Sequence, residues 1–191
     1  TSLFAAAKFP FPQDQNFKYG VRPTNTVHNV VQRAYEVWLA NYYEESGSQA
    51  RIKWDTASLT VSEGIGYGML IFVWMDNAKN NTQAKFDKLW AYYKAHLDEN
   101  GLMHWKIQGF TNNAPGQGAA TDGDVDVAFA LCLAYYQWGN ASYKTDATNL
   151  LNKIWQYEVR NGQVLKPGDR FDNVFNPSYF ITAGFNMFYK I

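Results

Sequence analysis

The sequence has very little cysteine, no net charge and no long hydrophobic run. Its one cysteine, Cys132, has no disulfide partner and lies among apolar residues, so we expect it to be a small buried side chain. The 17 basic residues equal the 17 acidic ones, which argues against nucleic acid or an anionic membrane as a partner. No stretch of about eighteen apolar residues is present, so no membrane-spanning helix is expected. These absences favour a neutral ligand.

Aromatic residues are abundant instead. Trp, Tyr and Phe make up 17% of the chain, with seven, thirteen and thirteen copies. Large aromatic side chains dominate hydrophobic cores, which accounts for many of them. An excess of aromatic rings in a chain of low charge is also typical of surfaces that stack on sugar rings.

Apolar periodicity predicts an all-α chain that forms a single domain over residues 1–191. The chain is expected to begin with an extended arm over 1–25. Loops are expected over 44–60, where residues 51–60 form no convincing buried strand, and over 161–175. The connection 100–118 is expected to contain one short strand near 101–107. Amphipathic segments alternate with segments that are apolar on nearly all sides. The expected helices are 26–43, 62–75, 82–97, 120–138, 143–159 and 176–191, the second, fourth and sixth of them buried.

This alternation predicts helical hairpins with an outer and an inner layer. The inner helices then begin at the same rim of the molecule. Glu63, Asp122 and Tyr179 each lie at the start of one inner helix. We therefore expect one rim to collect polar and aromatic side chains.

Three alternate glycines open the first inner helix, in Ser62-Glu63-Gly64-Ile65-Gly66-Tyr67-Gly68-Met69. Ser62 is the expected N-cap. Each glycine costs up to about 1 kcal/mol relative to alanine in a helix, so we expect close approach of a backbone or a ligand there. The spacing does not fit the G-x-G-x-x-G dinucleotide fingerprint. Glu63 is either a favourable acid in a first turn or, with Tyr67 one turn later, a carboxylate on the floor of a cleft.

A second acidic cluster, Asp122, Asp124 and Asp126, opens the next inner helix. It is not an EF-hand, since that loop requires Gly and Glu where this chain has Val127 and Leu133. These acids can cap the helix, and carboxylates can also accept strong hydrogen bonds from sugar hydroxyls.

At these residues the chain resembles glycoside hydrolase family 8, which includes endo-β-1,4-glucanases, lichenases, chitosanases and xylanases. The residues Ser62–Met69 look like the family's S-E-G-x-G-Y-G-M segment, and Ala120-Thr121-Asp122-Gly123-Asp124 looks like its A-T-D-[AG]-D signature. Three further segments resemble its cellulase branch, in the same order along the chain: 101–105, 165–170 and 176–180.

The resemblance implies an (α/α)6 barrel and inverting, endo-acting hydrolysis of β-1,4-glucan, either cellulose or mixed-linkage β-glucan. Glu63 would be the general acid, and Asp122 would hold the distorted sugar at the cleavage site. Tyr67, Trp105 and Tyr179 would bind substrate. Phe171 stands where the cellulase branch commonly has a tryptophan, so it keeps a ring but lacks the indole N–H.

The family barrel has twelve helices, so this chain supplies about half of it, and no residue here matches the family's general base. The expected partners are a β-glucan polysaccharide or oligosaccharide and the missing C-terminal half of the barrel. No cofactor and no metal are expected, because acid–base glycoside hydrolysis needs neither. Polymeric glucan is met outside the cytoplasm, so an extracellular or periplasmic location is expected. The alternatives are a non-catalytic glycan-binding or assembly module, and a family 8 chitosanase or xylanase.

Overall fold

A computed structural model describes residues 6–16, 18–21, 25 and 27–191. The expected helix start at Thr26, Pro23 and parts of the expected arm 1–25 lie outside the described residues. The helices are α1 (His28–Tyr42), α2 (Ser62–Trp74), α3 (Gln83–Ala95), α4 (Thr121–Trp138), α5 (Ala141–Tyr157) and α6 (Thr182–Phe188), with a 3-10 turn η1 (Pro177–Tyr179) before α6. Among the described residues, no helix is both long and apolar enough to cross a membrane.

Within the described residues, three small antiparallel sheets lie between the helices in the chain. Strand β1 (Tyr43–Ser46) pairs with β2 (Gln49–Ile52), β3 (Leu59–Val61) with β4 (Lys106–Gln108), and β5 (Val159–Arg160) with β6 (Val164–Leu165). The register of β3 and β4 places Val61 opposite Lys106. Helix α2 begins directly after Val61, so its first residue lies next to the loop between α3 and β4. The β3–β4 pair therefore holds the starting end of α2.

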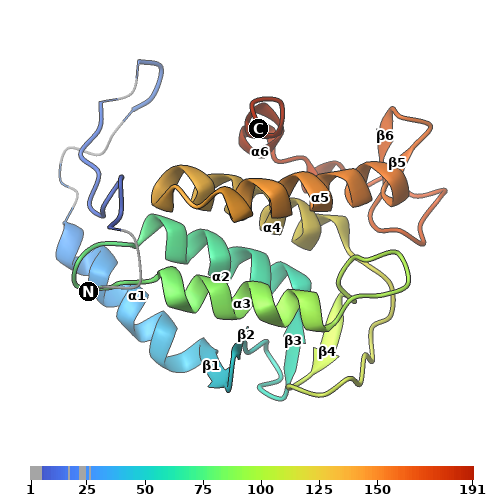
Figure 1. Cartoon of the computed structure of the whole chain (residues 1–191), viewed down its shortest axis with the longest axis horizontal. Helices are drawn as coiled ribbons and strands as arrows, with labels where there is room; N and C mark the ends of the chain where they lie inside the picture. The colour runs from blue at the N-terminus through green and yellow to red at the C-terminus, as the bar shows by residue number, and fades with distance from the viewer. Residues whose placement is uncertain (1–5, 17, 22–24, 26) are drawn as a thin grey trace.

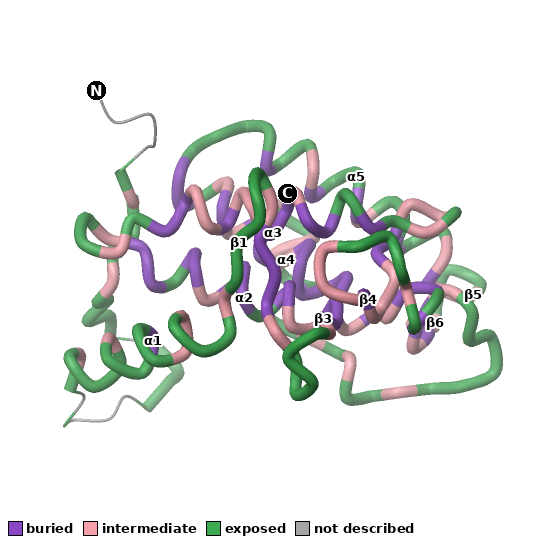
Figure 2. Tube along the Cα trace, turned by 90° about the horizontal axis from the view of Figure 1, so that it is seen from below, coloured by how far each residue is buried: buried purple, intermediate pink, exposed green. Residues whose placement is uncertain are grey.

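The core lies around α2 and α4, which pack against each other. Helix α3 covers α2, and α5 covers α4 (Figure 1). The tube coloured by burial is mostly purple along α2 and α4 and mostly green along α1 (Figure 2). The predicted inner helices α2 and α4 are thus confirmed, with bounds within one residue of those expected. Cys132 is buried and free, as predicted.

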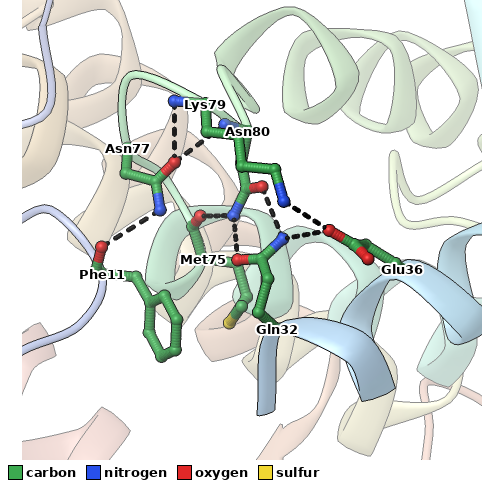
Figure 3. Close-up of polar contacts among 7 residues, drawn as sticks. All are labelled: Phe11, Gln32, Glu36, Met75, Asn77, Lys79 and Asn80. Carbon is green, nitrogen blue, oxygen red and sulfur yellow. Dashed lines mark hydrogen bonds and ion pairs between the residues drawn. The ribbon is translucent and has the colours of Figure 1, made fainter. Parts of the chain in front are cut away.

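Helix α1 is tied to the rest of the molecule by polar groups at one end of the core. Asn80 exchanges two hydrogen bonds with Gln32 of α1, of 2.7 and 3.0 Å, and its amide also donates to the Met75 carbonyl at 2.7 Å. Lys79 forms an ion pair with Glu36 of α1 at 2.8 Å. These side chains converge from α1 and from the connection between α2 and α3 (Figure 3). These polar contacts help to position α1, which has only one buried residue of its own.

Helical spacing predicts that the first helix has an apolar stripe formed by Val27, Val30, Val31, Ala34, Val37 and Trp38, and this prediction is wrong for the valines. Val30 and Val37 are 62% and 52% exposed, and the one buried residue of α1 is Tyr35, which lies off that stripe. Tyr35 and Trp38 pack on Phe72 of α2, and this contact decides which face of α1 points inward. The valines of the stripe are exposed, whereas Trp38 packs against the core.

Residues 44–60 are not simply a loop, which corrects a second prediction. Strand β2 lies in this region, and its Arg51 is buried because the guanidinium donates to the carbonyls of Ala57 and Leu59 and to the Thr60 hydroxyl, at 2.8 to 3.2 Å. Arg51 also forms an ion pair with Glu44. Because Arg51 is polar and yet buried through these partners, the apolar pattern of the sequence does not indicate this strand.

The expected final helix 176–191 is wrong in extent and in burial. The η1 turn begins at Pro177, whose ring suits the first position of a helix, but the chain then leaves the helical conformation at Phe180. Helix α6 starts only at Thr182, and its one buried residue is Gly184. The short strand near 101–107 exists but begins later than expected, at Lys106.

Candidate active site

The starting end of α2 is held by backbone contacts. The Ser62 N–H donates to the Trp105 carbonyl at 3.0 Å. The expectation that Ser62 caps this helix is wrong, because Ser62 is already helical, Val61 occupies the cap position and no side chain caps the helix. The Ser62 side chain is instead buried at the contact with α4. Glu63 therefore begins its helix beside the Trp105 loop.

Glycines allow α2 and α4 to approach each other at this end. A Cβ added to Gly66 would lie 2.7 Å from the Cβ of Asp126, and one added to Gly123 would lie 2.8 Å from the Glu63 nitrogen. A Cβ on Gly68 would meet Ile52 and Leu89, each at 2.8 Å. Close approach of a backbone is thus confirmed for Gly66, whereas the close neighbours of Gly68 are side chains. No backbone approaches Gly64 closely, and its nearest neighbours are side-chain atoms at an ordinary 3.7 Å.

The start of α4 is anchored to the loop that contains Phe171. The Thr121 N–H donates to the Pro167 carbonyl at 3.1 Å, and the Ala119 N–H donates to Oδ1 of Asp169 at 2.9 Å. Asp169 also accepts a 2.8 Å hydrogen bond from the Asn100 amide. Two loops that the sequence singled out thus flank the beginning of α4.

A pocket of about 250 Å³ lies where α2, α4 and η1 begin. Its lining residues are Glu63, Tyr67, Asp122, Asp126, Ser178, Tyr179 and Ile181. The expected rim is therefore present, and it brings together four of the predicted site residues from three separate segments.

Hydrogen bonds and burial shape the chemistry of this pocket. The Tyr67 hydroxyl donates to Oε1 of Glu63 at 2.8 Å, and this bond raises the pKa of Tyr67. Burial is the main cause of a raised pKa at Asp122, and the charge of Glu63 adds to it, whereas the Gly123 N–H, which donates to Oδ1 at 2.8 Å, opposes it. The pocket therefore concentrates acidic groups in partly desolvated surroundings.

Asp126, the third acid of the cluster that was predicted to cap the helix or bind sugar hydroxyls, also lines the pocket. It is 7% exposed, and its pKa rises to about 7, first because of burial and then because of the charges of Asp122 and Glu63. The signal was present in the sequence: Asp126 follows Asp122 by four residues, which places both on one face of α4.

Trp105 and Phe171 do not line this pocket. The Trp105 ring packs over Gly116 and beneath the Lys106 ammonium, whose nitrogen lies 4.2 Å from the ring centre. Phe171 is 51% exposed and contacts the loop at Gly168. Both residues lie on loops whose backbones hold the starts of α2 and α4.

Asp124, the middle acid of the cluster, points away from the pocket into the core. It is fully buried, it accepts a hydrogen bond from Tyr93, and burial raises its pKa to about 8. Glu158 follows the last residue of α5 and is also fully buried; burial first, and then the charge of Asp124, raises its pKa well above the usual value. Within the described residues, no group of three or more His, Cys, Asp or Glu side chains is arranged to hold a metal ion.

A larger pocket of about 650 Å³ lies at the other end of α2 and α4. It is lined mainly by apolar residues, among them Phe11, Val73, Trp74 and Leu133. Asp14 is the one carboxylate among its described lining residues. It lacks the pair of acids that acid–base chemistry requires, so the smaller pocket at Glu63 is the candidate active site.

Comparison with known proteins decides the family. The model of glycosyl hydrolases family 8 matches residues 10–190. The chain belongs to this family. It is 37% identical to Endoglucanase 2 of Ruminiclostridium josui over 96% of this chain and 43% of that protein. It is also 35% identical to a beta-glucanase of Niallia circulans, over 93% of this chain and 48% of that protein.

Solved structures agree with this family assignment. A beta-1,3-1,4-glucanase from Paenibacillus sp. X4 superposes with a TM-score of 0.88 at 34% identity, covering 95% of this chain and 53% of that one. The fold of the family is an (α/α)6 barrel. The family's enzymes hydrolyse their substrates with inversion of the anomeric configuration. The chain spans about half the length of the curated relatives it matches, so the helices described here are about half of a family 8 barrel.

Proposed function

We propose that the protein containing this chain is an endo-acting, inverting glycoside hydrolase that cleaves β-1,4 linkages of cellulose or mixed-linkage β-glucan. The observation that carries the proposal is the pocket that groups Glu63, Tyr67 and Asp122 at adjoining helix starts. Membership in family 8 and relatives named as endoglucanases and beta-glucanases support it.

Glu63 is the proposed general acid. Its Oε1 already accepts the Tyr67 hydroxyl at 2.8 Å, which leaves Oε2 to carry the proton for the glycosidic oxygen. Tyr67 thereby orients the carboxyl group and also forms part of the sugar-binding wall. As the proton moves to the leaving oxygen, the bond from that oxygen to the anomeric carbon breaks, and Glu63 is left as a carboxylate.

The attacking water forms its bond to the anomeric carbon from the opposite face of the sugar and gives its proton to a second carboxylate. Inverting enzymes separate the two carboxyl groups by roughly 6.5–9.5 Å so that this water fits between them. We place the base outside residues 1–191. Asp122 has a different role: it accepts a hydrogen bond from a hydroxyl of the sugar at the cleavage site as that ring flattens.

Aromatic side chains complete the proposed cleft. Tyr179 lies in the pocket with Asp122, so it contacts the same sugar. Trp105 and Phe171 lie outside the pocket, on the loops that anchor the starts of α2 and α4. We assign them to the neighbouring sugar units, where ring stacking matters more than acid–base chemistry.

A substrate panel tests the proposal. The full-length protein is incubated with carboxymethylcellulose, mixed-linkage β-glucan, chitosan and xylan, and the first product is followed by proton NMR. We expect rapid loss of viscosity with the two glucans and initial release of the α-anomer. Release of the β-anomer would contradict inversion, and preference for chitosan or xylan would move the protein to another substrate class within the family.

Turnover by the isolated 191-residue chain and by the full-length protein distinguishes the enzyme from the alternative, a binding or assembly module. If the base lies elsewhere, the isolated chain should turn over no substrate, and the full-length protein should. A full-length protein that binds cello-oligosaccharides but cleaves none would support the module instead.

We further propose an extracellular or periplasmic location and catalysis without a cofactor. Polymeric glucan is a substrate found outside the cytoplasm, and the proposed chemistry needs two carboxyl groups and water. Fractionation of the source cells tests the location: activity confined to the cytosol would contradict it.

A further inference from the structure

Asp126 presents to the pocket a carboxyl group that has no partner among the described residues. Asp126 is 7% exposed, and it lines the pocket that also contains Glu63 and Asp122. Among the described residues, no hydrogen bond or ion pair reaches its carboxyl oxygens. Because the residue is largely buried while its carboxyl oxygens stay open to the pocket, a hydroxyl group of a ligand can reach them there.

The backbone holds Asp126 in this position. Its Cβ lies against Gly66 of α2, where an added Cβ would come within 2.7 Å. The close contact between the two helices gives the side chain little room to turn away from the pocket. Asp126 also stands one turn after Asp122 on the same face of α4.

We propose that Asp126 is a sugar-binding residue, whose carboxyl group donates one hydrogen bond to the hydroxyls of the sugar at the cleavage site and accepts another. This assignment rests on the proposed function, and it adds a second acid of α4 to the residues that hold that sugar. The ligand class is a neutral pyranose that presents two adjacent hydroxyl groups.

The charges around Asp126 determine which protonation state binds. Glu63 and Tyr67 face it from α2, Asp122 from its own helix and Tyr179 from η1, and no basic side chain lines the pocket among the described residues. Burial and the two neighbouring acids raise its pKa to about 7. A sugar that displaces water from the pocket would disfavour a further charge there. Binding should therefore favour the protonated carboxyl group, which can donate as well as accept.

Calorimetric titration of the full-length protein with cellohexaose tests this assignment. Every protein in the comparison, including the parent, carries Glu63→Gln to prevent turnover. Burial, the main cause of the raised pKa of Asp126, is unaffected by that change. The parent is compared with versions that also carry Asp126→Asn or Asp126→Ala. Asparagine keeps a donor group and an acceptor but cannot ionise, whereas alanine removes both. Asp55→Asn, at an exposed acid outside the pocket, is the matched control.

We expect the parent to take up protons when it binds cellohexaose at pH 8, as measured in buffers of different ionisation enthalpy. Its affinity for cellohexaose should also fall between pH 6 and 9. Asp126→Asn should remove most of the proton uptake and flatten this dependence, and Asp55→Asn should change neither. Asp126→Ala should weaken binding about tenfold at pH 6. If the alanine version does not fold, the asparagine version decides.

Two outcomes would overturn the assignment in distinguishable ways. If the parent binds cellohexaose and both Asp126 variants show its affinity and its proton uptake, Asp126 does not contact the sugar and the proposed function stands. If the parent binds no cellohexaose at any pH, the proposed function fails, and the assignment of Asp126 fails with it.

Discussion

The Tyr67 hydroxyl donates a 2.8 Å hydrogen bond to Oε1 of Glu63, one turn earlier on α2. The bond orients the proposed general acid without involving the oxygen that carries its proton. Tyr67→Phe removes the hydroxyl and keeps the ring. Because a hydrogen bond to a charged group contributes about 1.5–3 kcal/mol, kcat should fall roughly ten- to a hundredfold.

Steady-state kinetics on mixed-linkage β-glucan with the full-length enzyme check this prediction. Tyr189→Phe is a suitable control, because Tyr189 is 92% exposed and lies outside the pocket. Equal kcat for the parent and Tyr67→Phe would show that Tyr67 does not position Glu63.

Asp122→Asn separates a sugar-binding role from helix capping. The Asp122 carboxylate accepts the Gly123 N–H at 2.8 Å, and an asparagine oxygen can accept the same bond. We therefore expect the melting temperature to change little. If the charge binds a sugar hydroxyl in the transition state, kcat should fall by about one to two orders of magnitude. A loss of stability with unchanged kcat would return Asp122 to a structural role.

Two neighbouring glycines form a matched pair of tests. Gly66→Ala places a Cβ 2.7 Å from that of Asp126 and should force α2 and α4 apart, at a cost of about 1–3 kcal/mol in the free energy of unfolding, together with lower activity. Gly64→Ala meets ordinary contacts at 3.7 Å and gains up to about 1 kcal/mol of helix propensity. Urea denaturation should therefore rank Gly64→Ala at or above the parent and Gly66→Ala below it. The reverse order would contradict the helix contact described here.

The buried acids behind the site predict how stability depends on pH. The Asp124 pKa rises from 3.8 to about 8 on folding, so the folded state binds more protons than the unfolded state between these values. Stability should then fall as pH rises through this window. Asp124→Asn retains an acceptor for Tyr93 and cannot ionise, so its melting temperature should decline less between pH 5 and 9 than that of the parent. Parallel declines would show that Asp124 does not titrate in this range.

Removal of divalent metal should leave activity unchanged, because the proposed mechanism uses carboxyl groups alone. Activity is measured before and after dialysis against EDTA, and again after addition of calcium. Loss of activity with EDTA and recovery with calcium would reopen Asp122, Asp124 and Asp126 as metal ligands.

The sequence predicted the buried helices well for a physical reason. Helices α2 and α4 are apolar around most of their circumference, so their bounds are visible without knowledge of the tertiary contacts. The meeting of Glu63 and Asp122 followed from the alternation of inner and outer helices. The resemblance supplied their chemical roles, which stay predictions until they are tested.

Other features depended on contacts that the sequence does not display. Strand β2 was missed because Arg51 is buried through polar partners. The inward face of α1 was misplaced because Tyr35, rather than the valine stripe, packs on α2. Gly64 resembles Gly66 in the sequence, and only the crossing of α2 and α4 distinguishes them.

The central claim is that Glu63 is the general acid, and Glu63→Gln in the full-length enzyme tests it most directly. General acid catalysis contributes about 10²–10⁴-fold, so kcat on mixed-linkage β-glucan should fall by that factor. The loss should shrink on an aryl β-cellobioside with an acidic phenol, because that leaving group needs little protonation. Hydrolysis of the glucan within a factor of a few of the parent, or an equal loss on both substrates, would contradict the assignment.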